Sequence, residues 1–226
     1  MTIKEKPIVD VVEVYSKTDR YIEENQKSIS IIVAAIVLIV GGYFAYKKLY
    51  VEPLDIEARS QMYVAEQYFE KDSLDLAING DGNYLGFLDI IDEYSVTPSG
   101  NLAHYYLGIC YLRKGQYEDA IDHLSEFDSD DEIVSSVAAG AIGDAYMELG
   151  KTKDAVSYYL RAANDKENQF TTPIYLMKAA LAYEDLGNYK KAVGLYEQIK
   201  DDYPDTKEGG EVDKYLARAE QLRSRQ

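Results

Sequence analysis

The sequence predicts an all-α protein: one N-terminal transmembrane helix, then a solenoid of about four helix pairs, then a C-terminal capping helix. Two observations support this fold class. A stretch of 19 residues, Ser28 to Tyr46, contains no charged side chain. Beyond it, one pattern of tyrosine, glycine and alanine recurs three times at nearly equal spacing. The expected divisions are a short head at 1–27, the membrane helix at 28–50, a degenerate first helix pair at 51–100, three repeats at 101–207 and the capping helix at 208–226.

The uncharged stretch is long enough to cross a bilayer. As a helix, its 19 residues would run about 28 Å, close to the roughly 30 Å of the hydrocarbon core. A charged head precedes it and no small-x-small cleavage site follows it, which favours an uncleaved anchor over a signal peptide. The flanking positive charges are balanced, so they leave the orientation open. The residues assigned to the anchor are Ile31, Val33, Ile36, Leu38, Gly41, Gly42 and Phe44.

The remainder of the chain is acidic. Residues 51–226 contain 17 Lys or Arg and 34 Asp or Glu, a net charge of about −17. Such a surface disfavours nucleic acid and anionic headgroups as partners. The single cysteine, Cys110, excludes a disulfide within the chain and is expected to be a small buried apolar residue.

The repeated pattern has a physical reason at each position. A glycine four residues after each tyrosine predicts a helix end in the left-handed conformation, and small residues before and after it predict close helix packing. The repeats are offset by 35 and 37 residues. The aligned residues are Gly108, Gly143 and Ala180; Tyr111, Tyr146 and Tyr183; Gly115, Gly150 and Gly187; Ala120, Ala155 and Ala192; and Leu124, Tyr159 and Tyr196.

These aligned residues resemble the tetratricopeptide repeat family. Outside the three units, residues 53–71 are predicted to form a helix with 83–94 as its partner, joined by a loop at 79–83. Pro204 is expected to close the third unit, and residues 212–222 to form the cap that a solenoid needs at its open end.

The resemblance implies a concave groove that binds protein partners, lined by the first helix of each pair. Its mixture of adaptable apolar groups and carboxylates suits an extended or helical segment with some basic character. We expect about half of the apolar residues at these positions to pack between helices instead. The positions carried over from the family are Leu102, Tyr105, Ile109, Leu112 and Arg113; Val137, Gly140, Asp144, Met147 and Glu148; and Ile174, Met177, Leu181, Glu184 and Asp185.

The sequence carries little that indicates catalysis, so we expect no enzyme activity, no cofactor, no metal site and no small-molecule substrate. Its two histidines, His104 and His123, belong to no metal-spacing motif. The loop at 79–83 is a fragment of a calcium loop in which Ala77 and Leu88 occupy ligand positions. The acidic run 128–132 is predicted to be a solvated loop between repeats.

The whole architecture is similar to the bacterial YfgM-type family, the ancillary subunits of the SecYEG translocon. That resemblance implies a single-pass inner-membrane protein with a cytoplasmic head and periplasmic repeats. Its implied partners are the translocon, periplasmic chaperones or isomerases, and emerging secretory or outer-membrane proteins. Two alternatives stay open: a scaffold for another envelope assembly, such as a secretion apparatus or cell division, and an enzyme or metal-dependent regulator.

Overall fold

The computed structural model describes the backbone of residues 11–225 and the side chains of residues 24–225. Over that range the regular structure is entirely helical, without a strand. The chain divides after Pro53 into two compact units. The predicted all-α class is therefore confirmed for the described residues.

The first unit is one long helix, α1 (Val11–Tyr46), followed by a π-helical segment, η1 (Lys47–Val51). The predicted head is helical from residue 11 onward, and its residues 1–10 lie outside the described residues. The described helical stretch Glu24–Glu70 is long and apolar enough to hold one candidate membrane span. Its most apolar 18 residues have a mean hydropathy of 2.4, and none of them is buried. Membrane insertion stays a prediction. The assigned anchor residues are all exposed: Ile31, Val33, Ile36, Leu38, Gly41, Gly42 and Phe44.

The second unit begins with α2 (Glu52–Glu70), α3 (Leu74–Asn79) and α4 (Phe87–Tyr94). The predicted partner helix at 83–94 is wrong at its start, and α3 was not predicted. The Asp81 carboxylate accepts the backbone N–H groups of Asn83 and Tyr84, both at 2.9 Å, and the Tyr68 hydroxyl at 2.8 Å. These bonds hold 81–84 in a turn, so the helix begins later.

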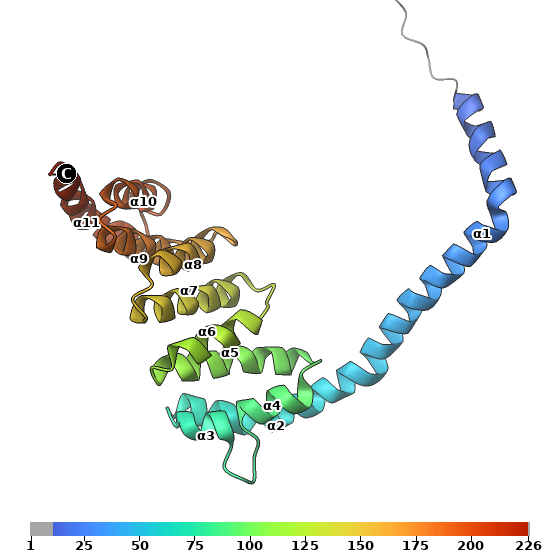
Figure 1. Ribbon diagram of the computed structural model, residues 1–226, viewed down its shortest axis with the longest axis horizontal. Coiled ribbons are helices and arrows are strands. Elements are labelled where there is room, and N and C mark those ends of the chain that lie inside the picture. Colours follow the sequence, from blue (N-terminus) through green and yellow to red (C-terminus); the bar gives the residue numbers. More distant parts are fainter. Residues whose placement is uncertain (1–10, 226) are drawn as a thin grey trace, which may run out of the picture. The chain divides into compact units, whose positions relative to one another are not determined.

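Three helix pairs and a closing helix follow in chain order, as Figure 1 shows. Helices of successive pairs lie side by side, as expected for a solenoid. The elements are α5 (Pro98–Arg113) with α6 (Tyr117–Glu126), α7 (Glu132–Glu148) with α8 (Thr152–Asn164), α9 (Thr172–Asp185) with α10 (Tyr189–Asp202), and α11 (Lys207–Arg223).

The turns within the three pairs confirm the glycine prediction. Gly115, Gly150 and Gly187 have φ of +75°, +69° and +69°. The residue after each glycine donates its N–H to the carbonyl of the aligned tyrosine, at 2.9, 2.9 and 2.8 Å. This bond closes a left-handed C-terminal turn that satisfies a carbonyl the helix leaves free.

Small residues bring the two helices of each pair together, as the pattern predicted. A β-carbon on Gly108 would fall 2.5 Å from Leu124 Cγ, and one on Gly143 would fall 2.6 Å from the Tyr159 ring. The aligned alanines, Ala120, Ala155 and Ala192, are completely buried. Any larger residue at these positions would force the helices apart.

The α2 helix is fastened to the repeats by a buried carboxylate. Asp55, which is 6% exposed, accepts the backbone N–H and the hydroxyl of Ser99 at 2.9 and 2.8 Å. Phe69 on α2 packs edge-on against Phe87 of α4 and Tyr106 of α5. The degenerate first pair therefore shares one core with the first repeat.

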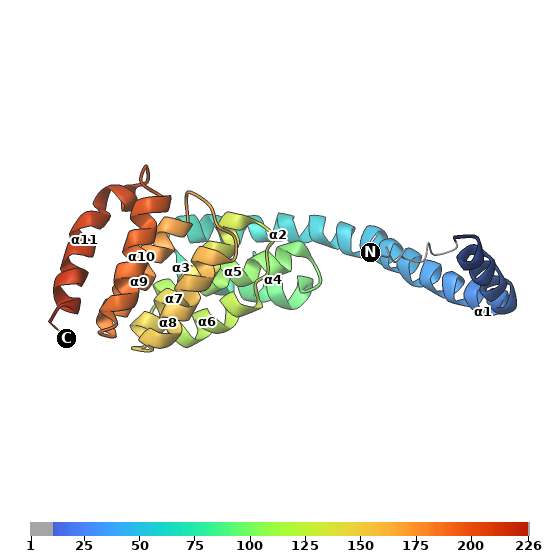
Figure 2. The ribbon, with the colours of Figure 1, turned by 90° about the horizontal axis from the view of Figure 1, so that it is seen from above.

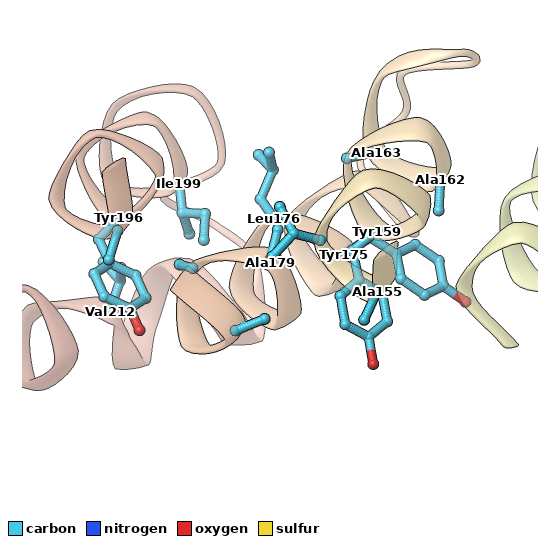
Figure 3. Packing of buried hydrophobic residues seen from close by; sticks show 14 of the residues in the cluster. Ala155, Tyr159, Ala162, Ala163, Tyr175, Leu176, Ala179, Tyr196, Ile199 and Val212 are labelled. Carbon is cyan, nitrogen blue, oxygen red and sulfur yellow. The ribbon is translucent and has the colours of Figure 1, made fainter. Parts of the chain in front are cut away.

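The far end of the unit is closed by α11, which lies beside α10 (Figure 2). Val212 of α11 is fully buried with Tyr196 and Ile199 of α10, as Figure 3 shows. Each such side chain contributes roughly 1.5–3 kcal/mol through burial. The capping helix is thus confirmed, although it begins at Lys207 rather than at Val212.

Candidate functional site

A groove of about 590 Å³ runs across the three pairs. Four apolar side chains form one part of its wall, and acidic, basic and phenolic side chains form the rest. Most of them project from the first helices α5, α7 and α9. The groove residues are Leu112, Tyr117, Asp144, Met147, Glu148, Tyr159, Lys178, Leu181, Ala182 and Asp185.

One carboxylate of the groove is held by two neighbours. Lys178 Nζ lies 2.7 Å from both oxygens of Asp144, and the Tyr159 hydroxyl donates to Asp144 at 2.6 Å. Burial, and then the bond to Asp144, raise the pKa of Tyr159, so its hydroxyl stays protonated and keeps donating. The charge of Asp144 is therefore largely neutralised within the groove.

Two further carboxylates, Glu148 and Asp185, are the last residues of α7 and α9. Tyr117 Oη donates to Glu148 at 3.3 Å, and Thr152 Oγ1 donates to Asp185 at 3.1 Å. Both hydroxyls come from the start of the second helix in the preceding pair. Neither carboxylate takes part in an ion pair with a described lysine or arginine.

The sequence and the fold have counterparts among known proteins. The sequence profile of the family described as "T7SS, ESX-1 secretion system protein EccA1, N-terminal domain" matches residues 14–211. The chain belongs to the EccA1 N-terminal domain family. This match covers the candidate membrane span and all three repeats.

Two curated relatives share part of this EccA1-family sequence. Elongator complex protein 1 of Saccharomyces cerevisiae is 36% identical over 124 residues, and tetratricopeptide repeat protein 29 of Macaca fascicularis is 26% identical over 121 residues. The matches cover 52% and 50% of this chain. The chain spans only 8% and 26% of the lengths of these relatives.

Solved structures share the fold. The nearly identical TPR-like repeats of a Podosopora anserina kinesin light chain match 75% of this chain with a TM-score of 0.56 and 19% identity, over 88% of their own length. MamA matches 74% of this chain and 88% of its own, with a TM-score of 0.54 and 20% identity. The tetratricopeptide-like fold is thereby confirmed for this EccA1-family chain.

The structure brings six of the predicted groove positions together in the groove itself: Leu112, Asp144, Met147, Glu148, Leu181 and Asp185. Leu181 keeps 38% of its surface exposed, so an apolar contact is available there. Their role in binding a partner stays a prediction.

The other predicted positions lie elsewhere. Arg113 stacks over the Phe69 ring at 4.4 Å and pairs with Asp72 at 3.7 Å. Glu184 accepts the Tyr196 hydroxyl at 2.6 Å and Arg218 at 2.8 Å. The remaining positions pack into the cores or are half-buried outside the groove wall: Leu102, Tyr105, Ile109, Val137, Gly140, Ile174 and Met177.

Sequence reasoning missed four groove residues: Tyr117, Tyr159, Lys178 and Ala182. The first two belong to second helices, which the family's groove positions leave out. A signal existed for Lys178, because it is the single charge in the mostly apolar run 173–182 of α9. A lone charge within an apolar helix face indicates a partner nearby.

The other candidate sites have structural partners. Asp131 of the acidic run caps α7 by accepting the N–H groups of Ile133 and Val134, each at 2.9 Å. His104 and His123 face one another between α5 and α6 with their Nδ1 atoms 3.3 Å apart. Among the side chains of residues 24–225, no three potential ligands gather in a metal-binding arrangement.

Proposed function

We propose that this chain is a non-catalytic, membrane-anchored tetratricopeptide adaptor that binds segments of other proteins during secretion. The observation that carries the proposal is the groove, whose wall holds the exposed Leu181 and the half-buried Leu112 and Met147 beside charged groups. Adaptable apolar side chains within a polar frame are typical of surfaces that hold peptide segments. The candidate span at 28–46 would tether the repeats to a bilayer.

The first candidate partner is the SecYEG translocon, with periplasmic chaperones or isomerases and emerging secretory proteins as further partners. The resemblance of the whole architecture to the YfgM-type family supports it. In this arrangement the N-terminus is cytoplasmic and the repeats are periplasmic in a bacterial inner membrane. Reporter fusions after Gln26 and after Glu52 test the orientation, and a cytoplasmic repeat domain would overturn this candidate.

A photo-crosslinking residue at Leu49 or Ile56 tests the partner itself. Both side chains are well exposed, at 77% and 67%, and lie close to the candidate span. In living cells we expect capture of a translocon subunit. A crosslinking residue at Glu197, exposed on α10 outside the groove, is the matched control. If no channel subunit is captured above the level of that control, the translocon candidate is contradicted.

The second candidate is a scaffold within a dedicated secretion apparatus, and the EccA1-family match favours it. The same groove would then hold one defined subunit of the apparatus. Crosslinking from Leu181, inside the groove, separates the two candidates. A single recurring apparatus subunit supports the scaffold, whereas many different secretory clients support the translocon adaptor.

A further inference from the structure

The C-terminal ends of α7 and α9 carry an acidic residue and no compensating base. The C-terminus of a helix carries partial negative charge, so a basic residue in the last turn is stabilising and an acidic one is not. A lysine or arginine occupies the last turn of α5, α8, α10 and α11, whereas α2, α3, α4, α7 and α9 have no basic residue there. Instead α7 ends in Glu148 and α9 ends in Asp185.

These two unfavourable helix ends lie in the same groove. The only hydrogen bonds described for their carboxylates come from the hydroxyls of Tyr117 and Thr152, which leave the negative charge in place. The one lysine in the groove wall, Lys178, is already bound to both oxygens of Asp144. The groove therefore combines two uncompensated charges with the field of two helix ends, all of one sign.

Apolar surface lies between these charges. Leu112, Met147 and Leu181 come from three successive first helices and line the same cavity of about 590 Å³. A volume of that size accommodates several side chains of a peptide. The occupant of this groove must therefore carry both a positive charge and an apolar side chain.

We infer that the groove takes a protein segment that presents a lysine or arginine to Glu148 and Asp185, with a bulky apolar side chain against Leu112, Met147 and Leu181. This inference rests on the proposed function, in which the groove binds protein segments. The cation of the segment interacts favourably with both carboxylates and with the partial negative charge of the two helix ends. It thereby compensates the repulsion between each acidic residue and its own helix C-terminus, which the free protein retains. Local mismatches that persist in a folded protein are expected where they serve binding.

The test uses the full chain in detergent micelles and a fluorescent peptide that alternates leucine and lysine. Glu148→Gln with Asp185→Asn is expected to weaken binding about tenfold or more in fluorescence anisotropy at about 150 mM salt. The matched control, Glu197→Gln with Glu220→Gln, removes the same charge from exposed positions outside the groove and should change binding less than about twofold. A peptide with glutamine in place of lysine should bind weakly to every variant.

A second readout separates binding from folding. Neutralising Glu148 and Asp185 removes wrong-sign charge from two helix ends, so the melting temperature should stay level or rise. Peptide binding that is equally strong in the groove and control variants overturns the inference, as does no binding of the leucine–lysine peptide to the wild-type chain. If the peptide fails to bind but a crosslinking residue at Leu181 still captures a partner in cells, the proposed function survives that result. If the wild-type chain neither binds the peptide nor gives any crosslink from Leu181, both proposals are overturned.

Discussion

Gly143 of α7 lies directly against the aromatic ring of Tyr159 of α8, with no space for a side chain between them. An added β-carbon would fall 2.6 Å from two ring carbons of Tyr159. The ring cannot swing away, because its hydroxyl is bonded to Asp144 at 2.6 Å and the side chain is 4% exposed. This contact sets the separation of the two helices in the second repeat and positions one wall of the groove.

Gly143→Ala should therefore destabilise the protein despite the better helix propensity of alanine. We expect the free energy of unfolding to fall by about 1–3 kcal/mol through overpacking. Gly194→Ala on α10 is the control, because its β-carbon would meet no atom within 4 Å, and it should stabilise by up to about 1 kcal/mol. Urea unfolding followed by far-ultraviolet circular dichroism measures both, and equal effects would contradict the packing argument.

The histidine pair predicts a loss of stability on mild acidification. Burial lowers the pKa of both His104 and His123 from the ordinary 6.5, and the neighbouring His123 lowers that of His104 further. Asp119, Asp122 and Glu126 on α6 act against this but do not reverse it. As the pH falls below about 6.5, the two histidines bind protons in the unfolded chain but not yet in the folded chain, so the free energy of unfolding declines. The decline ends once the pH is below the lower pKa values of the folded state.

The measurement compares the free energy of unfolding at about pH 7.5 and about pH 5.5 in the wild type and in His104→Gln with His123→Gln. The decline should be smaller in the variant, which has no imidazole to protonate. Identical declines would assign the pH dependence to the carboxylates of this acidic chain instead.

The hydrogen bonds between Asp55 and Ser99 predict a clear stability effect at the start of the repeat unit. Asp55→Ala should lower the free energy of unfolding by about 1–2 kcal/mol, because it leaves buried polar groups of Ser99 unpaired. Arg59 also contacts Asp55, at 2.7 Å, but its side chain is 69% exposed. Arg59→Met should therefore change the free energy of unfolding by less than about 1 kcal/mol. A larger loss would show that the ion pair with Arg59, and not the bonds to Ser99 alone, accounts for the contribution of Asp55.

Cys110 should be chemically inert in the folded protein. It is fully buried, and burial raises its pKa to about 11, so almost no thiolate exists at neutral pH. An aromatic disulfide reagent should label it slowly in buffer and rapidly in concentrated urea. Rapid labelling of the native chain would contradict the packing described for α5.

The sequence was a good guide wherever one residue type has one structural use. Gly115, Gly150 and Gly187 located three turns, because left-handed backbone and a following helix demand glycine there. It was a poor guide between residues 71 and 86, where the fold depends on how Asp81 is bonded by Tyr68, thirteen residues earlier. Such a contact leaves no periodic signal.

The groove was partly predictable for a related reason. Position within a repeat identifies the face of a helix, and that was sufficient for Asp144, Met147 and Leu181. It does not reveal whether a neighbouring helix covers that face. Tyr105 and Met177 were predicted at the groove and instead pack into cores, because the neighbouring pairs fill that space.

Glu184 and Asp185 are adjacent in sequence and equal in formal charge, yet they present different surfaces to an approaching partner. Arg218 reaches back from α11, 34 residues along the chain, and binds Glu184 at 2.8 Å, together with the Tyr196 hydroxyl at 2.6 Å. No lysine or arginine among the side chains of residues 24–225 pairs with Asp185, which lines the groove. The closing helix thus neutralises one carboxylate of this adjacent pair, and the other carboxylate faces the groove.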